Sequence, residues 1–190
     1  MPAPITYCEA IRYMQSAEAA LHRFYHDEQY GFPINDDNEL FGRLILEINQ
    51  AGLSWTTILK KQEHFRRAYD GFSISHVAAY GEKDVHRLLS DAGIIRNRLK
   101  VAAAIHNAGV ILQLQKQYGS FKNWLDVHHP LTKEDWTKLF RNTFRFTGGE
   151  IVNEFLLSTG YLAGAHGADC PVFQKILNQQ PAWHSRSKKL

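Results

Sequence analysis

LEINQAGLSW, residues 46–55, is the stretch from which the fold of this chain can be worked out. The helix that leads into it contains four residues at steps of four, three and four: Leu40, Leu44, Glu47 and Ala51. Residues with this spacing lie along one face of a helix. Glu47 therefore lies at the edge of an apolar face, where an unpaired carboxylate is costly. Its position indicates a role beyond packing.

The same stretch contains the end of one helix and the start of the next. Gly52 can adopt a left-handed backbone conformation and end the first helix, which places Leu53 at the tip of a turn. Ser54 is a favourable N-cap for a second helix from Trp55 to about Tyr69. We therefore expect a helix, a tight turn with an apolar tip, and a second helix.

The composition is ordinary for a soluble globular protein. The chain has 190 residues, of which 44% are hydrophobic and 22% charged, and this fits a single helical domain over residues 1–182, or two lobes around one cleft. Residues 183–190 are expected to form a frayed tail. No apolar run approaches the roughly 20 residues that span a bilayer and no signal peptide is recognisable, so we expect a cytoplasmic protein. The net charge of +3 permits a polyanionic partner without requiring one.

The apolar periodicity predicts an all-α protein, since no strand alternation, repeat or linker is recognisable. Residues 1–13 contain two prolines and little pattern, so we expect an arm there. Helices are predicted over residues 15–29, from the capping residues 35–37 onward, and over 55–69, 75–80, 82–90, 98–118, 136–141 and 150–158. Ser16, Ser75 and Thr132 are the expected caps of the helices that follow them. A turn or two of helix is expected at 121–127, and a short helix after the loop 160–167.

A short helix, a tight turn at residues 92–98 and a long helix follow one another, which is the order of a helix–hairpin–helix. Such a hairpin directs backbone N–H groups at a phosphate without reading sequence. The turn contains Gly93 and Ile95, and positive charge is added there by Arg96, Arg98 and Lys100. The alternative is an ordinary helix connection in which the isoleucines belong to the core.

Two cysteines and two histidines could form one metal site. His166-x-x-x-Cys170 brackets a loop-to-helix turn and could supply two ligands to one ion. Cys8 and His26 could complete a tetrahedral Cys2His2 set that ties the two ends of the chain together. The spacing is not that of a standard zinc finger and the chain has ten histidines, so unrelated thiols and imidazoles remain the alternative.

Aromatic residues accompany the carboxylate of Glu47 in the sequence: Phe24, Tyr25, Tyr30 and Trp55. Aromatic faces near one carboxylate would suit a flat, polar and cationic ring. Alternatively, each aromatic side chain packs in a helical core and Glu47 is a surface residue or a structural ion-pair partner. Serine hydrolysis lacks support because Ser54 has no nucleophile-elbow motif, and nucleotide hydrolysis lacks support because no Gly-rich phosphate loop with Lys is present.

Several ordered motifs resemble the DNA-3-methyladenine glycosylase I family, a branch of the helix–hairpin–helix DNA glycosylases. The likeness extends over roughly residues 8 to 175. It rests on Tyr25-His26-Asp27, Tyr30-Gly31, Pro33, the stretch 47–55, Leu59-Lys60-Lys61, the stretch 91–96, Phe144-Arg145-Phe146 and His166-x-x-x-Cys170.

The resemblance implies a helix–hairpin–helix DNA glycosylase fold and monofunctional base excision repair. The expected reaction flips 3-methyladenine or a related alkylated base out of duplex DNA and releases it by hydrolysis. Glu47 would be the catalytic residue in contact with the base, which would be lined by Tyr25, Tyr30 and Trp55. Leu53 would fill the gap left in the duplex, and Gly52 would allow close approach to DNA.

The same resemblance implies a structural zinc ion that joins the N- and C-terminal segments. Its ligands would be Cys8, His26, His166 and Cys170. The expected partner is duplex DNA with alkylated bases, bound by a monomer without a membrane or a nucleotide cofactor.

The sequence also departs from the family's usual residues at positions that shape the base pocket. Tyr30 stands where Trp is usual, and His22 stands where an aromatic residue is expected. Residues 147–154 and 164–165 differ as well. These departures keep open a non-catalytic or substrate-shifted module that binds damaged DNA on the same fold. A purely structural helical protein would require the four-ligand set and the apolar turn to be coincidental.

Overall fold

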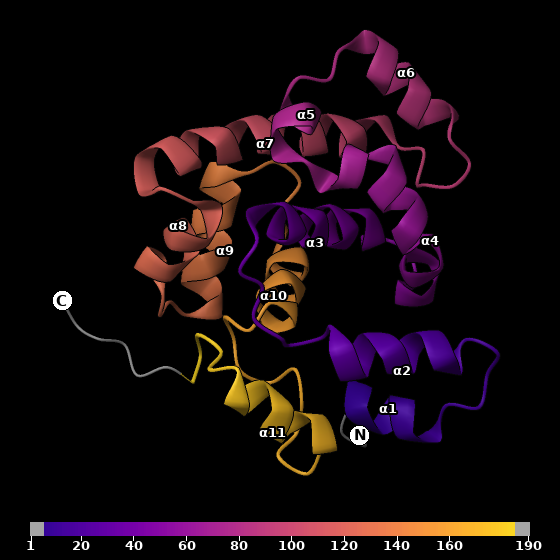
Figure 1. The fold of residues 1–190 in the computed structure, drawn as a ribbon, viewed down its shortest axis with the longest axis vertical. Helices are drawn as coiled ribbons and strands as arrows, with labels where there is room; N and C mark the ends of the chain where they lie inside the picture. The colour runs from indigo at the N-terminus through magenta and orange to yellow at the C-terminus, as the bar shows by residue number, and fades with distance from the viewer. Residues whose placement is uncertain (1–5, 185–190) are drawn as a thin grey trace. The chain divides into compact units, whose positions relative to one another are not determined.

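The computed structural model describes residues 6–184, which form helices and turns without any strand (Figure 1). The predicted all-α class is confirmed for this part of the chain. Among its helices, none combines the length and the apolar content that a bilayer crossing requires. The helices are α1 Tyr7–Tyr13, α2 Ala19–Glu28, α3 Asp37–Gln50, α4 Trp55–Ala68, the 3-10 turn η1 Asp70–Phe72, α5 Ile74–Ala78, α6 Glu82–Ser90, α7 Arg98–Tyr118, α8 Phe121–His128, α9 Lys133–Thr143, α10 Gly149–Ser158 and α11 Pro171–Asn178.

The chain divides into two compact units. The middle unit is continuous, Ile34–Phe155, and the terminal unit combines the described residues up to Pro33 with those from Leu156 onward. A single domain over residues 1–182 stays a prediction. Of the expected frayed tail, residues 185–190 lie outside the described part, whereas the Trp183 ring packs against Phe173 with centroids 6.0 Å apart.

The middle unit is built around α7, which contacts α3, α5, α6 and α8 (Figure 1). The residues of α7 that are almost completely buried include Val101, Ala104, Ala108 and Ile111. The sequence periodicity predicts one buried stripe of Val101, Ile105, Ala108 and Leu112, of which Ile105 and Leu112 are only half-buried. With neighbours on several sides, α7 carries apolar residues nearly all round, so its periodicity does not define one face.

In the middle unit, aromatic side chains of α8, α9 and α10 pack against one another. The Phe140 ring lies 5.4 Å from that of Phe144 and 5.5 Å from that of Phe155, centroid to centroid. Phe121 and Phe140 are completely buried. Burying one such side chain contributes about 1.5–3 kcal/mol to stability. This unit therefore has an apolar core of its own.

The start of α3 shows why this helix forms where it does. The Asp36 side chain accepts a hydrogen bond from Glu39 N at 3.0 Å, as an N-cap should. The Asp37 carboxylate accepts from the backbone amides of Phe121 and Lys122, at 2.7 and 2.9 Å. One acidic pair thus starts α3 and fastens it to the start of α8.

The prediction of an arm over residues 1–13 is wrong for residues 7–13, which form α1. The Thr6 hydroxyl accepts from Glu9 N at 3.2 Å, and the Glu9 carboxylate accepts from Thr6 N at 2.8 Å. This reciprocal capping box supplies the helix start that the two prolines obscured. Residues 1–5 lie outside the described part.

Other helix boundaries differ by a few residues. The helix predicted from residue 15 begins at Ala19, and its N-cap is Glu18 rather than Ser16. The N-cap of α5 is Ser73 rather than Ser75. Both α8 and α9 are longer than predicted, while Thr132 caps α9 as expected.

Candidate functional site

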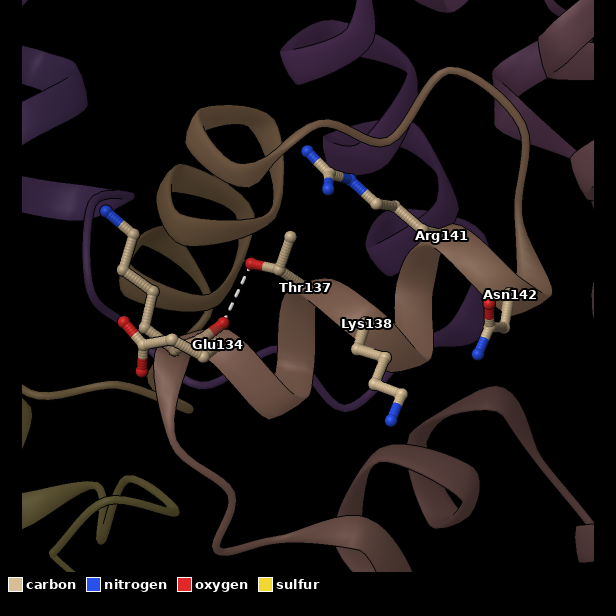
Figure 2. A pocket seen from close by; sticks show the side chains of 6 residues that line it. Glu134, Thr137, Lys138, Arg141 and Asn142 are labelled. Atoms are coloured by element: carbon tan, nitrogen blue, oxygen red, sulfur yellow. Dashed lines mark hydrogen bonds between the residues drawn. The ribbon is translucent and has the colours of Figure 1, made fainter.

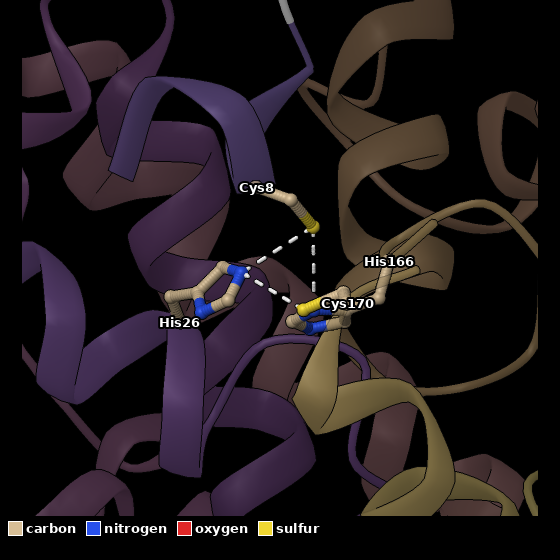
Figure 3. A group of neighbouring side chains, drawn as sticks. All are labelled: Cys8, His26, His166 and Cys170. Atoms are coloured by element: carbon tan, nitrogen blue, oxygen red, sulfur yellow. Dashed lines mark hydrogen bonds between the residues drawn. The ribbon is translucent and has the colours of Figure 1, made fainter. Parts of the chain in front are cut away.

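The terminal unit brings the two cysteines and two of the histidines together (Figure 3). The Cys8 Sγ atom lies 3.3 Å from His26 Nε2 and 3.6 Å from His166 Nδ1. The Cys170 Sγ atom lies 3.4 Å from His166 Nδ1 and 3.7 Å from His26 Nε2. All four potential ligand atoms lie within 4.8 Å of one another. Residues from α1, α2, the loop before α11 and the N-cap of α11 therefore converge on one point.

This cluster fits a tetrahedrally bound ion. With metal–sulfur bonds of about 2.3 Å and metal–nitrogen bonds of about 2.0–2.1 Å, adjacent sulfur and nitrogen ligands lie about 3.5 Å apart. The four sulfur–nitrogen distances, 3.3 to 3.7 Å, bracket that value. The cluster could accordingly hold a metal ion.

Each histidine also has its outer nitrogen engaged, as metal-binding histidines usually do. His26 Nδ1 donates to the Asp27 carboxylate at 2.7 Å, and His166 Nε2 donates to the Tyr30 carbonyl at 2.8 Å. Both rings therefore present their remaining nitrogen to the thiols. Burial lowers the pKa of His166, which favours the neutral imidazole that binds metals, and burial raises the pKa of the Cys8 thiol.

Beside this cluster lies a group of aromatic rings in the same unit. The Tyr30 ring lies 5.6 Å from that of Tyr25 and 5.4 Å from that of Tyr7. The Tyr7 hydroxyl contacts His22 Nδ1 at 2.9 Å. Tyr25 and Tyr30, the two predicted base-binding residues of this unit, are thus neighbours, whereas Phe24 is 57% exposed and points elsewhere. Tyr7 was missed because it falls in the supposed arm, although the Thr6–Glu9 capping box could have revealed it.

The stretch 46–55 in the middle unit has the predicted geometry. Glu47 is buried in α3, with 4% of its surface exposed. The helix ends at Gln50, and Gly52 adopts φ 82°. Leu53 follows with 38% exposure, and the Ser54 hydroxyl caps α4 by accepting from Thr57 N at 3.3 Å. A buried carboxylate and an exposed apolar tip thus lie six residues apart.

The turn between α6 and α7 is equally tight. Gly93 N donates to the Asp91 carboxylate at 2.7 Å, and Lys61 Nζ donates to the Ala92 carbonyl at 2.7 Å. A side chain at position 93 would collide with His64, whose Nδ1 would be 2.7 Å from the added Cβ. Any other residue here would force the side chain of His64 or Asp91 to move.

The charged residues predicted at this turn do not all face outward. Ile94 is buried and Ile95 half-buried, while Arg96 and Arg98 are exposed. Lys100 is buried, and its ammonium group donates to the carbonyls of Asn49 and Ala51 at 2.9 and 2.8 Å. Its positive charge is thus directed into the protein.

A shallow pocket on α9 forms a separate feature of the middle unit (Figure 2). Lys138 and Arg141 extend from the helix around it, and Thr137 donates to the Lys133 carbonyl at 2.7 Å. The sequence did not single out these residues. The pocket is an open hollow between solvated side chains.

Comparisons with known proteins give these features a context. A family model described as methyladenine glycosylase matches residues 15–139. The chain is 37% identical over 169 residues to DNA-3-methyladenine glycosylase 1 of Escherichia coli, covering 79% of this chain and 90% of that protein. It is 33% identical to DNA-3-methyladenine glycosylase of Haemophilus influenzae, covering 81% of this chain and 93% of that protein.

Solved structures agree with the sequence comparisons. The 3-methyladenine DNA glycosylase I of Staphylococcus aureus, whose recognition of 3-methyladenine has been described, superposes with a TM-score of 0.76 at 29% identity, covering 88% of this chain and 97% of that one. A variant of 3-methyladenine DNA glycosylase I in complex with 3-methyladenine gives 0.74 at 30% identity, covering 86% and 96%. The chain therefore belongs to the methyladenine glycosylase family.

Proposed function

We propose that this chain is a monofunctional DNA glycosylase of base excision repair. It flips 3-methyladenine or a related alkylated base out of duplex DNA and releases it by hydrolysis. The observation that carries this proposal is the 37% identity, over 79% of the chain, to an enzyme named for that activity. The stretch 46–55, with its buried carboxylate and exposed apolar tip, supports it independently.

The chemistry of the substrate suits a buried carboxylate. Methylation at N3 makes the adenine cationic, so the base leaves readily once it has been unstacked. The protein must grip the base and stabilise the dissociating state rather than provide a strong acid or a nucleophile. We assign Glu47 to contact with the base, since a carboxylate so far removed from water interacts strongly with a cation. Tyr25, Tyr30 and Trp55 are assigned to line the base.

DNA binding is assigned to two turns of the middle unit. Leu53 would occupy the space that the flipped base leaves, and Gly52, with nothing within 4 Å of an added Cβ, leaves the turn open to the duplex. The helix–hairpin–helix assigned to α6 and α7 would present the backbone at Gly93 and Ile95 to a phosphate, with Arg96 and Arg98 adding charge.

We infer that the cluster in the terminal unit would hold zinc, because two thiolates and two imidazoles in tetrahedral spacing are its typical structural set. With all four positions taken by Cys8, His26, His166 and Cys170, zinc would supply a crosslink rather than chemistry. The reaction requires no second copy, so the proposed state is a monomer, and the proposed location is the cytoplasm.

The experiment is chromatographic detection of bases released from methylated duplex DNA. Wild type should release free 3-methyladenine, and Glu47→Gln should release much less. Glu39→Gln provides the matched control, because Glu39 lies on the same helix and pairs with Arg66 at 2.6 and 2.7 Å outside the assigned site. It should retain wild-type release.

Two other outcomes would change the assignment. Undiminished release by Glu47→Gln would remove the role given to that residue. Tight binding of alkylated duplex by the folded wild type, with no base released after long incubation, would favour the damaged-DNA-binding module instead. The departures at His22, Tyr30 and residues 147–154 would then be the first places to examine.

A further inference from the structure

Lys100 has an unusual position for a lysine near a DNA-binding turn. Only 5% of its surface is exposed, and its ammonium group lies against the C-terminal end of α3. It donates to the Asn49 carbonyl at 2.9 Å and to the Ala51 carbonyl at 2.8 Å. The last carbonyls of a helix lack partners within the helix and carry its negative dipole end, so they attract a cation.

The residues that follow Asn49 form a type II turn. Ala51 adopts φ −49° and ψ 116°, and Gly52 adopts φ 82°, the values of its two central positions. Leu53 N donates to the Gln50 carbonyl at 2.7 Å, which closes the turn. The Gln50 side chain in turn donates to the Leu53 carbonyl at 2.9 Å. Hydrogen bonds through both its N–H group and its carbonyl group thus fix the backbone of Leu53.

The hydrogen bond to Ala51 selects this turn over its alternative. Type I and type II turns differ mainly in the orientation of the central peptide, whose carbonyl belongs here to Ala51. The ammonium group binds that carbonyl and so favours the orientation in which Gly52 has positive φ. Because Leu53 comes next, Lys100 determines the direction in which the exposed leucine leaves the turn.

Lys100 also contacts a third segment. Its Nζ lies 5.9 Å from the centre of the Phe146 ring, a distance typical of a cation–π interaction. Phe146 is 39% exposed and adopts φ 61°, which is uncommon for a residue other than glycine. One ammonium group therefore connects the first turn of α7, the turn at residues 50–53 and the loop before α10.

A simple packing role does not account for this arrangement. Removing an ammonium group from water is costly, and burial lowers the pKa of Lys100. An apolar side chain of the same length would fill the space without that cost. What the lysine provides and an apolar residue would not is a fixed orientation of two carbonyls.

We propose that Lys100 is a positioning residue, which holds the turn at residues 50–53 so that Leu53 enters the duplex when the hairpin at residues 92–98 engages it. This role rests on the proposed function, in which Leu53 fills the gap left by the flipped base. It replaces the phosphate contact expected of Lys100 from the sequence.

The test compares Lys100→Met with Lys122→Met. Methionine has nearly the same length and keeps the packing, and Lys122 is the control because its ammonium group pairs with Asp126 at 2.7 Å on α8, in neither of the two turns. Single-turnover release of 3-methyladenine should fall about 10- to 100-fold in Lys100→Met, as expected for the loss of charged hydrogen bonds. Affinity for undamaged duplex should stay within about threefold, since only the step after binding is affected.

A second readout follows Leu53 itself. The probe is a duplex that contains an abasic-site analogue with 2-aminopurine beside it, whose fluorescence reports filling of the gap. Lys100→Met should shift the signal towards that of Leu53→Ala, whereas Lys122→Met should resemble wild type. The double variant Lys100→Met with Leu53→Ala should lose little more activity than Leu53→Ala alone, because both changes affect one step.

Additive losses in the double variant, or a wild-type fluorescence signal in Lys100→Met, would overturn the inference. Lys100→Gln, which retains a donor, should recover part of the activity, and failure of both variants to fold would assign Lys100 to stability alone. If wild type releases no base at all, the proposed function fails, while the fluorescence comparison still decides whether Lys100 positions Leu53.

Discussion

In the middle unit, aromatic side chains such as Phe121 and Phe140 are completely buried in an apolar core, whereas two thiols and two imidazoles meet within the terminal unit. Among the described residues of the terminal unit, a small apolar cluster consists of Cys170, Val172 and Ile176 with a few partly buried neighbours. Small folds commonly use a metal where the apolar core is insufficient. A metal held by this cluster would give the terminal unit a source of stability that differs from the apolar core of the middle unit.

The two units also differ in what their proposed functional residues require from the fold. The middle unit carries Glu47 and the turns assigned to DNA, which need a rigid support. The terminal unit carries Tyr25 and Tyr30, and its cluster includes His26, the residue next to Tyr25 in the sequence. A metal at that point would fix the backbone at His26, close to Tyr25 on α2 and to Tyr30 just after the end of that helix.

Removal of one metal ligand should give the largest effect. Cys170→Ser should lower the metal content from about one ion per chain to near zero and unfold the terminal unit, because structural zinc contributes about 10–16 kcal/mol in small zinc-dependent folds. Elemental analysis and amide hydrogen exchange check this. Protection should be lost in α1 and α11 and kept in α7. Simultaneous loss in all three helices would contradict independent stabilisation of the units.

A cavity in the core of the middle unit should lower the stability of that unit and leave metal binding unchanged. Phe140→Ala removes a completely buried ring and should reduce the free energy of unfolding by about 3–5 kcal/mol. Thermal or denaturant unfolding measures the loss, and the metal content should stay unchanged. Phe24→Ala, at a 57% exposed position, is the control and should change stability by less than about 0.5 kcal/mol. An equal loss in both variants would refute the assignment of the core.

The orientation of His26 offers a finer comparison within the terminal unit. Asp27 accepts from His26 Nδ1 at 2.7 Å, and Asp27→Ala should weaken metal affinity about 10- to 100-fold. Competition with a chelator measures this affinity. Glu28→Ala removes the neighbouring carboxylate, which pairs with Lys175 at 3.7 Å, and should leave the affinity unchanged. Equal weakening would indicate a general charge effect.

The same substitution, threonine to alanine at a helix cap, can be made in each unit. Thr6→Ala removes the cap of α1 and Thr132→Ala that of α9, and each should cost about 1 kcal/mol. Local hydrogen exchange should detect the Thr6 change in α1, near Cys8, with a small fall in metal affinity. The Thr132 change should not alter metal affinity at all. A fall in both variants would contradict the separation.

Local signals explain which parts of the fold could be predicted from the sequence. Asp36, Ser54 and Thr132 each cap a helix as predicted, because a cap depends on residues only a few positions away. The start of α1 carried the same signal, but it was outweighed by the nearby prolines. The buried stripe of α7 was only partly right, since tertiary neighbours rather than periodicity decide which residues are covered.

The candidate sites likewise divide into features set by local sequence and features set by long-range packing. The tight turn at Gly52 follows from local chemistry, whereas the four-residue metal set emerged from the sequence mainly through family resemblance. The contacts of Lys100 could not be predicted, because they join residues about fifty positions apart and depend on how α7 packs against α3. A lysine beside two arginines reads as surface charge until that packing is known.

The cluster of Cys8, His26, His166 and Cys170 brings together residues that are made at very different times during synthesis. Cys8 and His166 are 158 positions apart, so the ribosome completes the middle unit before it adds the second pair of ligands. A chain that stops after Phe155 keeps only two of the four ligands and cannot close a tetrahedral site. The cluster therefore cannot be completed before Cys170 has been added.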